Sequence, residues 1–490
     1  MGEQVSYSIS EAIEDIVDNR TLSYFDQELF GRVMAADAPI IDKTYLFADM
    51  ARFNTLYMIA RAGSGHLGSS FSSLDIMSWI YTHEFKDGDR FFSSKGHDSP
   101  GLYSVQTALD ILPFDKLHGL RRLGGLPGHP DIHTPGSVTN TGSLGMGISK
   151  AKGFLFADQL KGNSDSRVFV LTGDGELQEG QFWESLISAA NHFDERLIVI
   201  VDHNKIQSDT YVKDVSDLGD LVGKFKSFGW WASEGDGHDL NVINEFIQHE
   251  SQGKPKIFVA HTVKGKGVSF MEHTSMSADQ EYYSYHSGAP NEEDYLKAKD
   301  ELLKKVHTRA ASLGVTLDVP KEVDINTTSQ QHETERLILK YSDYILEEAQ
   351  NLPELVALDA DLVLDTGLIE FKNKYPERFV ECGIAEQDMV SQAGTMALAG
   401  LTPIVHSFSC FLTSRASEQI YNNCSQESKV IYAGSLAGLL PAGPGHSHQA
   451  VRDVAAMSAM PGMTIVEPIN STQLEKLFKW AVRTNSEIGR

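Results

Sequence analysis

An unbroken apolar run that leads directly into a glycine-rich turn limits the possible folds most strongly. Residues 167–172 read ArgValPheValLeuThr and continue into Gly173-Asp174-Gly175. The run predicts a buried strand, followed by a helix over about 179–193 and a second buried strand over 196–202. Apolar strands that alternate with helices form parallel sheets covered by helices on both faces. The sequence therefore predicts an α/β fold.

The same alternation continues on both sides of this unit. A helix is predicted from Leu46 because apolar residues recur at spacings of three and four as far as Ala60, and another strand is predicted over 256–260. A second series follows, with strands predicted over 354–358, 402–406, 429–433 and 463–466, and helices over 386–399 and 412–421. Two α/β domains are expected, each a mostly parallel sheet with helices on both faces.

Changes in composition mark the expected domain boundaries. Residues 1–45 are polar with short apolar patches and are expected to form an N-terminal extension laid on the surface. Residues 46–290 form the first predicted domain, and the charged segment 291–335 is expected to be a linker. Residues 336–490 form the second predicted domain.

The charge balance argues against some classes of partner. The 42 Lys and Arg residues are outnumbered by 67 Asp and Glu residues, which gives a net charge of −25 with His neutral. Because such a chain repels phosphate backbones and anionic lipids, and no Lys/Arg cluster opposes this locally, neither nucleic acid nor a membrane is expected as a partner. The acidic N-terminus does not resemble a secretory signal. Three cysteines without metal-ligand spacing, Cys382, Cys410 and Cys424, favour a reducing cytoplasm.

Asp174 and Asn204 are predicted to meet in one site. Asp174 lies at the end of one predicted strand, and Asn204 follows the end of the next. Ligands of open parallel sheets bind beyond the carboxyl ends of the strands, so both side chains are expected at one crevice. With the backbone carbonyl of Ile206 they could hold Mg2+, which prefers oxygen ligands and takes the others from phosphates and water. Gly173 and Gly175 would let the backbone approach a diphosphate closely, although Gly-Asp-Gly alone is a common turn sequence.

The order of further motifs points to a known family. Along the chain come GlySerGlyHis (63–66), SerLysGlyHis (94–97), GlyHisProAsp (128–131), ThrGlySerLeuGlyMetGlyIle (141–148), GlyAspGlyGluLeuGlnGluGly (173–180) and ValAspHisAsnLysIle (201–206). In this order they resemble the cofactor domain of the transketolase family. GlyIleAlaGluGln (383–387), the pair Phe408 and Phe411, and SerHisGln (447–449) resemble the pyrimidine-binding domain of that family. The resemblance extends from about residue 45 to the last residue.

This resemblance implies a thiamine diphosphate-dependent transferase built from two thiamine diphosphate-binding-fold domains. Such an enzyme moves a two-carbon ketol unit from a ketose donor to an aldehyde acceptor through a carbanion of the cofactor. Asp174, Asn204 and Ile206 would be the protein ligands of Mg2+, which Ca2+ or Mn2+ could replace. The other positions that match the family's cofactor contacts are His97, Gly142, Ser143, Leu144, Gly173, Gly175, Glu179, His286, Glu386, Phe408 and Phe411.

Glu386 is expected to activate the cofactor from the second domain. Removal of the thiazolium proton requires a carboxyl group against N1′ of the pyrimidine. Glu386 heads a predicted apolar helix, where burial would favour the protonated, donating form. Taken alone, it could equally be an acidic residue that favours the helix dipole. Phe408 and Phe411 would stack on the pyrimidine, although aromatic pairs at this spacing are also common in plain cores.

Histidines are the expected proton carriers. Breaking a carbon–carbon bond of a ketose requires protons to leave and return to hydroxyl groups, and imidazole titrates in a suitable range. The family match assigns this catalytic role to His66, His129, His286 and His448, and places His97 at the cofactor.

Two departures from the family pattern concern the substrate. Asp365 stands where family members that act on sugar phosphates carry a serine, and a carboxylate repels a phosphate. The loop 434–448 lacks the family's donor-reading histidine and aspartate, although His446 could replace one of them. A non-standard sugar or sugar-derivative substrate is therefore expected. A deoxyxylulose phosphate synthase-like decarboxylating ligase and a catalytically inactive cofactor-binding subunit of a split enzyme remain alternatives.

The resemblance also carries expectations about assembly. In the family, the diphosphate domain of one subunit and the pyrimidine domain of another build each site, so a homodimer with shared active sites is expected, with Glu179 at the interface between subunits. The family continues beyond the point where this sequence ends. The second domain is therefore expected to be incomplete at its C-terminal end, and a separate C-terminal-domain polypeptide could complete the enzyme.

Overall fold

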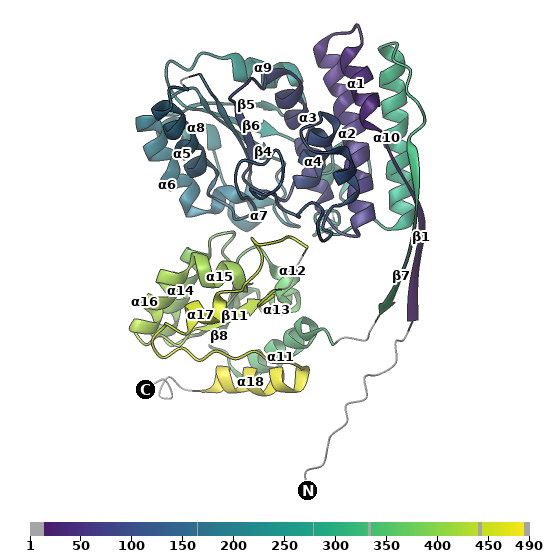
Figure 1. The fold of residues 1–490 in the computed structure, drawn as a ribbon. Coiled ribbons are helices and arrows are strands. Elements are labelled where there is room, and N and C mark those ends of the chain that lie inside the picture. Colours follow the sequence, from purple (N-terminus) through teal and green to yellow (C-terminus); the bar gives the residue numbers. More distant parts are fainter. Residues whose placement is uncertain (1–13, 164, 278, 332–334, 440–442, 485–490) are drawn as a thin grey trace.

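A computed structural model describes residues 14–163, 165–277, 279–331, 335–439 and 443–484. Figure 1 shows two domains that face each other, with an antiparallel ribbon of β1 (Glu14–Tyr24) and β7 (Lys321–Gln331) beside them. The ribbon pairs the first described strand with the strand that precedes the second domain.

The first domain is organised around a five-stranded parallel sheet. Its strands stand in the order β2 (Arg90–Ser93), β3 (Val168–Gly173), β4 (Leu197–His203), β6 (Lys256–His261), β5 (Trp231–Asp236). Alternate residues of β3 belong to different cores, since Phe169 and Leu171 face one cluster and Val168 and Val170 the other. This period of two places a hydrophobic core on each face of the sheet.

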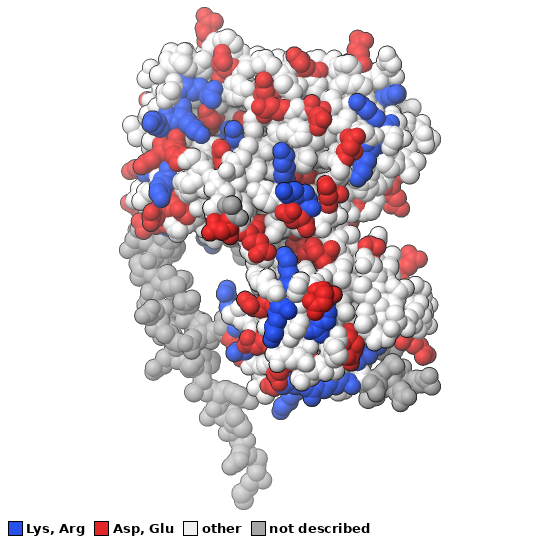
Figure 2. Space-filling model, turned by 180° about the vertical axis from the view of Figure 1, so that it is seen from behind, with Lys and Arg blue, Asp and Glu red and all other residues white. Residues whose placement is uncertain are grey.

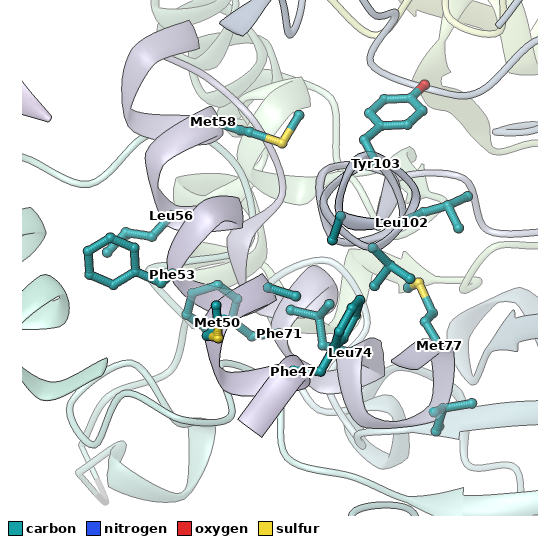
Figure 3. Close-up of a cluster of buried hydrophobic side chains, with 14 of the residues drawn as sticks. Phe47, Met50, Phe53, Leu56, Met58, Phe71, Leu74, Met77, Leu102 and Tyr103 are labelled. Carbon is teal, nitrogen blue, oxygen red and sulfur yellow. The ribbon is translucent and has the colours of Figure 1, made fainter. Parts of the chain in front are cut away.

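Helices cover both faces of that sheet. Figure 3 shows side chains of α2, α3 and α4 in the larger core, among them Phe47, Phe71 and Leu102. The helices of this domain are α1 (Gln27–Ala35), α2 (Ile40–Ala62), α3 (Leu67–Trp79), α4 (Ser99–Ala108), α5 (Gly147–Leu160), α6 (Gly180–His192), α7 (Val212–Ser216), α8 (Leu221–Ser227), α9 (Leu240–Gln248) and α10 (Glu292–Ser312).

The second domain repeats this plan on a smaller scale. Its parallel sheet has the order β11 (Ile431–Ser435), β10 (Thr402–Phe408), β8 (Leu355–Asp359), β9 (Phe379–Glu381). Its helices are α11 (Leu337–Asn351), α12 (Val363–Thr366), α13 (Ile369–Lys374), α14 (Glu386–Leu398), α15 (Ser409–Arg415), α16 (Ser417–Ser425), α17 (Asp453–Met457) and α18 (Ser471–Arg483). The predicted α/β class with parallel sheets is confirmed.

Two predicted boundary segments differ from the expectation. Within the expected N-terminal extension, α1 buries Leu29, Phe30 and Val33 in the larger core, so this part is not laid on the surface. Within the expected linker, α10 packs against α2 and buries one apolar face. A Lys/Glu-rich helix was expected within the linker, but its packing against α2 was not, and α1 was missed, because the buried apolar residues of both helices are separated by charged ones.

Two predicted elements of the second domain were also wrong. The helix expected over 412–421 is divided between α15 and α16, with Ala416 at the break. The strand expected over 463–466 does not form. These residues instead line a groove beside the edge strand β11 and, among the described residues, form no ladder of hydrogen bonds with it.

Charged side chains of both signs are interspersed on the face shown in Figure 2. Among the described residues, no helix combines the length and the apolar character needed to cross a membrane.

Candidate active site

A cavity of about 550 Å³ lies between the two domains of the chain. Its walls come from the loops after β3 and β4 in the first domain, and from the loop after β8, the start of α14 and α15 in the second. A volume of this size is ordinary for a cofactor or substrate pocket. The pocket lies beyond the carboxyl ends of parallel strands, as expected for this fold class.

Both domains of one chain contribute to this cavity, and the expected sharing of the site between subunits stays a prediction. Hydrogen bonds link the two domains of one chain around the cavity, from Ser208 Oγ to Asp361 Oδ2 at 2.8 Å and from the Ile384 N–H to Gln178 Oε1 at 2.8 Å. The segment from α10 through β7 to α11 connects the two domains, and residues of both domains of the one chain line the cavity.

Asp174, Asn204 and Ile206 are brought together at one end of this cavity. The Asp174 carboxylate accepts hydrogen bonds from the Gly175 N–H at 2.8 Å and the Lys205 N–H at 2.6 Å. Asn204 Oδ1 accepts one from the Ile206 N–H at 3.1 Å. Burial, together with the nearby Asp202 carboxylate, raises the pKa of Asp174 to about 6. The oxygens of this group therefore stand in a buried place where a cation would be stabilised.

The first of the histidines is delivered by the end of α2. Gly63 caps the helix with φ +73°, a conformation that favours glycine, and its N–H donates to the carbonyls of Ile59 and Ala60. The chain then turns, and His66 immediately precedes α3.

Five histidines surround the cavity. The His66 ring lies 5.3 Å from His97 and 5.2 Å from His286, and the His129 ring lies 4.9 Å from His448, measured between centroids. Burial holds the pKa of the first four well below the usual value and that of His448 at about 3. All five are therefore neutral imidazoles at pH 7, and each can donate one hydrogen bond and accept another.

Ser447 connects two of these histidines across the boundary between domains. Its Oγ lies 2.7 Å from His129 Nδ1 and 3.0 Å from His448 Nδ1. The hydroxyl has one proton to donate, so one imidazole accepts it and the other donates its own Nδ1–H to the oxygen. The two rings therefore hold their protons on different nitrogens, and the chain of hydrogen bonds can pass a proton between them.

Glu386 begins α14 and is joined to the first domain through Arg415. Arg415 Nη1 donates to Glu386 Oε1 at 2.7 Å and forms an ion pair with Glu179 Oε1 at 2.6 Å. Burial raises the pKa of Glu179 to about 8. Glu386 Oε2 is buried and has no hydrogen-bond partner among the described residues. It is therefore available to a ligand in the cavity.

Carboxyl groups at the boundary between the domains should make stability depend on pH. Burial, together with the adjacent Glu381, raises the pKa of Asp361 to about 7. The native state therefore holds this proton more tightly than the unfolded chain, and its contribution to stability, present below pH 4, is lost as the pH rises through 7. We expect Asp361→Asn to raise the unfolding temperature by several degrees at pH 8, but by little at pH 4.

Differential scanning calorimetry of the variant at both pH values checks this prediction. Asparagine keeps the acceptor for Ser208 and tolerates the φ of +61° at this position. The exposed Asp87→Asn is the matched control. An equal gain in unfolding temperature at both pH values would contradict the role assigned to the Asp361 proton.

Most of the predicted site residues line this one cavity. They are His66, His97, His129, Gly142, Leu144, Gly173, Asp174, Gly175, Asn204, Ile206, His286, Glu386, Phe408, Phe411 and His448. Ser143 is not among the lining residues, and Glu179 is connected to the cavity through Arg415. Sequence reasoning missed the lining cations Lys95, Arg121, Lys264 and Arg415, although Lys95 stands inside a quoted motif.

Comparisons with known proteins agree with this organisation. Residues 43–360 match the family model of the transketolase, thiamine diphosphate binding domain, and residues 339–488 match that of the transketolase, pyrimidine binding domain. Human transketolase is 28% identical over 460 residues, which cover 89% of this chain and 72% of the human protein. A Clostridium sp. (strain MSTE9) protein, named 6-deoxy-6-sulfo-D-fructose transketolase subunit SqwG, is 35% identical over 225 residues, or 43% of this chain and 82% of that protein.

A solved structure of transketolase from Campylobacter jejuni subsp. jejuni NCTC 11168 is also similar. It is 22% identical, with a TM-score of 0.48, and the match covers 90% of this chain and 77% of that one.

Proposed function

Because this chain belongs to the transketolase family, we propose that it transfers a two-carbon ketol unit from a ketose donor to an aldehyde acceptor, with thiamine diphosphate as cofactor. One observation carries the proposal. The cavity brings the unpartnered Oε2 of Glu386, from the second domain, into the same space as the Asp174 and Asn204 oxygens of the first.

The residues present fit this cofactor. One carboxylate, one amide and one backbone carbonyl, from Asp174, Asn204 and Ile206, form an oxygen donor set suited to Mg2+, and Ca2+ or Mn2+ could take its place. Such an ion would offset the cost of the buried Asp174 charge and would hold a diphosphate. Glu386 Oε2 supplies the acid group that an aminopyrimidine nitrogen requires, next to the Phe408 and Phe411 rings.

Thiamine diphosphate supplies, when bound, an acidic thiazolium C–H and an electron sink for the bond that breaks. Glu386 would present its unpartnered Oε2 to the pyrimidine, and Arg415 Nη1 donates to its other oxygen, Oε1. Leu144 and the two phenylalanines enclose the space between the domains with apolar surface, which strengthens electrostatic interactions inside it.

The histidines carry the protons of the sugar hydroxyl groups. Arg121 Nη2 lies 3.3 Å from His66 Nδ1, and because arginine only donates, the His66 proton resides on Nε2. Lys264 Nζ lies 3.2 Å from His286 Nδ1 and fixes that ring in the same way. The pair His129 and His448 shares its protons through Ser447, as described above.

We propose substrates other than the usual sugar phosphates. Asp365 lines the cavity, where its carboxylate opposes a phosphate. The similar Clostridium protein is named for a sulfonated ketose, and a sulfonate carries less negative charge than a phosphate dianion. We also propose that the chain works as a homodimer in the cytoplasm, where its three cysteines, free in this structure, would remain reduced.

Proton exchange at the thiazolium carbon tests the proposed activity. Incubated with thiamine diphosphate and Mg2+ in D2O, the protein should exchange this proton at least about 100-fold faster than the free cofactor does. A donor screen with ketoses ending in a hydroxyl, phosphate or sulfonate group should then yield an aldose shortened by two carbons. If the cofactor binds but exchange is not accelerated, the protein is an inactive cofactor-binding subunit.

A further inference from the structure

Arg121 is a cation in the cavity without a countercharge. Among the described residues no carboxylate forms an ion pair with it, and the atom Nε is buried without a hydrogen-bond partner. Its side chain contacts the neutral His66 ring, whose Nδ1 lies 3.3 Å from Nη2. Burial alone lowers the pKa of this guanidinium from its usual value. The residue as a whole is half-buried. An uncompensated charge that is partly removed from water is costly, so this arrangement favours a ligand that supplies the missing charge.

The backbone around Arg121 holds the side chain in place at a further cost. Arg121 adopts φ +52°, which is unusual for a residue other than glycine, and its N–H donates to the Leu126 carbonyl at 2.7 Å. A Cβ on Gly128 would lie 2.9 Å from Arg121 Nε, and one on Gly443 would lie 3.5 Å from Nη1. The absence of a side chain at Gly128 thus leaves room for the guanidinium, whereas a Cβ on Gly443 would make only an ordinary contact with it. Backbone strain of this kind is often kept at functional sites.

The other cations of the cavity are already engaged. Lys95 pairs with Asp98 and Asp202, and Arg415 pairs with Glu179 and Glu386. Lys264 Nζ donates to the carbonyls of Ile206, Gln207 and Ser208 beside the expected diphosphate site. Arg121 stands instead beside His66, in the histidine cluster. Of the four cations that line the cavity in the described part of the chain, Arg121 is therefore the one available to a substrate.

We propose that Arg121 binds an anionic group of the sugar substrate, and that this group is a monoanion of the sulfonate type and not a phosphate dianion. The inference rests on the proposed function and names its substrate class. A single guanidinium matches a single negative charge and can bind two of its oxygens at once. The neutral histidines add no charge, and the carboxyl groups of Asp361 and Asp365 line the same cavity. A second negative charge would therefore be left uncompensated.

Binding of three related hexitols tests this proposal without turnover. The probes are the reduced forms of fructose, fructose 6-phosphate and 6-deoxy-6-sulfofructose, which lack a carbonyl and cannot donate a ketol unit. Calorimetric titration into the cofactor-loaded protein at pH 8 should show the sulfonate bound at least tenfold more tightly than the other two. In Arg121→Gln its affinity should fall about 10- to 100-fold, the usual effect of losing a hydrogen bond to a charged group. Binding of the uncharged hexitol should not change.

Control variants separate this result from misfolding. Arg122→Gln removes a neighbouring exposed guanidinium that contacts the Arg61 and Ala62 carbonyls, and sulfonate affinity should be retained. Arg121→Lys keeps the charge and should retain part of the affinity. Unchanged sulfonate binding in Arg121→Gln, or an equal loss of affinity for all three hexitols, would overturn the role of Arg121. Tighter binding of the phosphate than of the sulfonate would overturn the proposal that the bound group is a monoanion. Thiazolium exchange in the same preparation reports separately on the proposed function.

Discussion

Glu386→Ala should slow thiazolium proton exchange by about 10²- to 10⁴-fold, the usual contribution of a positioned acid–base group. The cofactor should still bind, because Asp174 and Asn204 lie on the other domain. Asp174→Ala should have the opposite signature, since it removes a direct ligand of the proposed metal. We expect it to weaken thiamine diphosphate binding by more than about 100-fold, beyond the effect of losing a second-shell partner.

Calorimetric titration of thiamine diphosphate with Mg2+, combined with NMR exchange, measures both effects. The exposed Glu418→Ala and Asp214→Ala are the matched controls, and both should behave like the wild type. If the Glu386 and Asp174 variants had the same cofactor affinity, the assignment of separate roles to the two domains would be wrong.

A mixture of Glu386→Ala chains and Asp174→Ala chains should remain inactive. In this structure both residues line one cavity within a single chain. Each variant chain therefore carries a defect in its own site, and the other variant cannot supply the missing side chain. Sites shared between subunits predict a different result. In each heterodimer one of the two sites would combine two intact halves, and the purified heterodimers would regain about half of the wild-type activity.

Ketol transfer after coexpression of the two variants, with different affinity tags, measures this outcome. Purification through both tags in turn ensures that mixed particles are present. Heterodimers of a wild-type chain and the double variant give the opposite result and serve as the control. Sites within one chain leave the wild-type site active, whereas sites shared between subunits leave no site with two intact halves. Recovery of activity in the mixture of single variants would show that the two domains of neighbouring chains exchange places in solution.

The sequence predicted best those features that are local. The strands that end at Asp174 and Asn204 are continuous apolar runs followed by turns, and both formed with nearly the expected bounds. The path of α1 and α10 could not be predicted because their buried faces become apparent only when both pack against α2.

Site residues followed the same rule. Glu386 and the histidines other than His286 belong to contiguous motifs. Ser447 also lies in one of them, but its role, like those of Arg415 and Arg121, depends on contacts with residues distant in sequence. Ser447 lies 318 positions from His129, and no spacing pattern reports a contact of that kind. The sequence could not reveal the roles of these residues, because their roles depend on contacts between the two domains.

The hydroxyl of Ser447 makes the hydrogen-bond chain between two histidines depend on the contact between the domains. His129 belongs to one half of the molecule and His448 to the other, and a single oxygen bridges them. If the two domains separate, the hydrogen bond between Ser447 and His129 breaks as water enters the cavity. Proton transfer along this chain would then occur only while the cavity is closed, because the same contact closes the cavity and completes the chain.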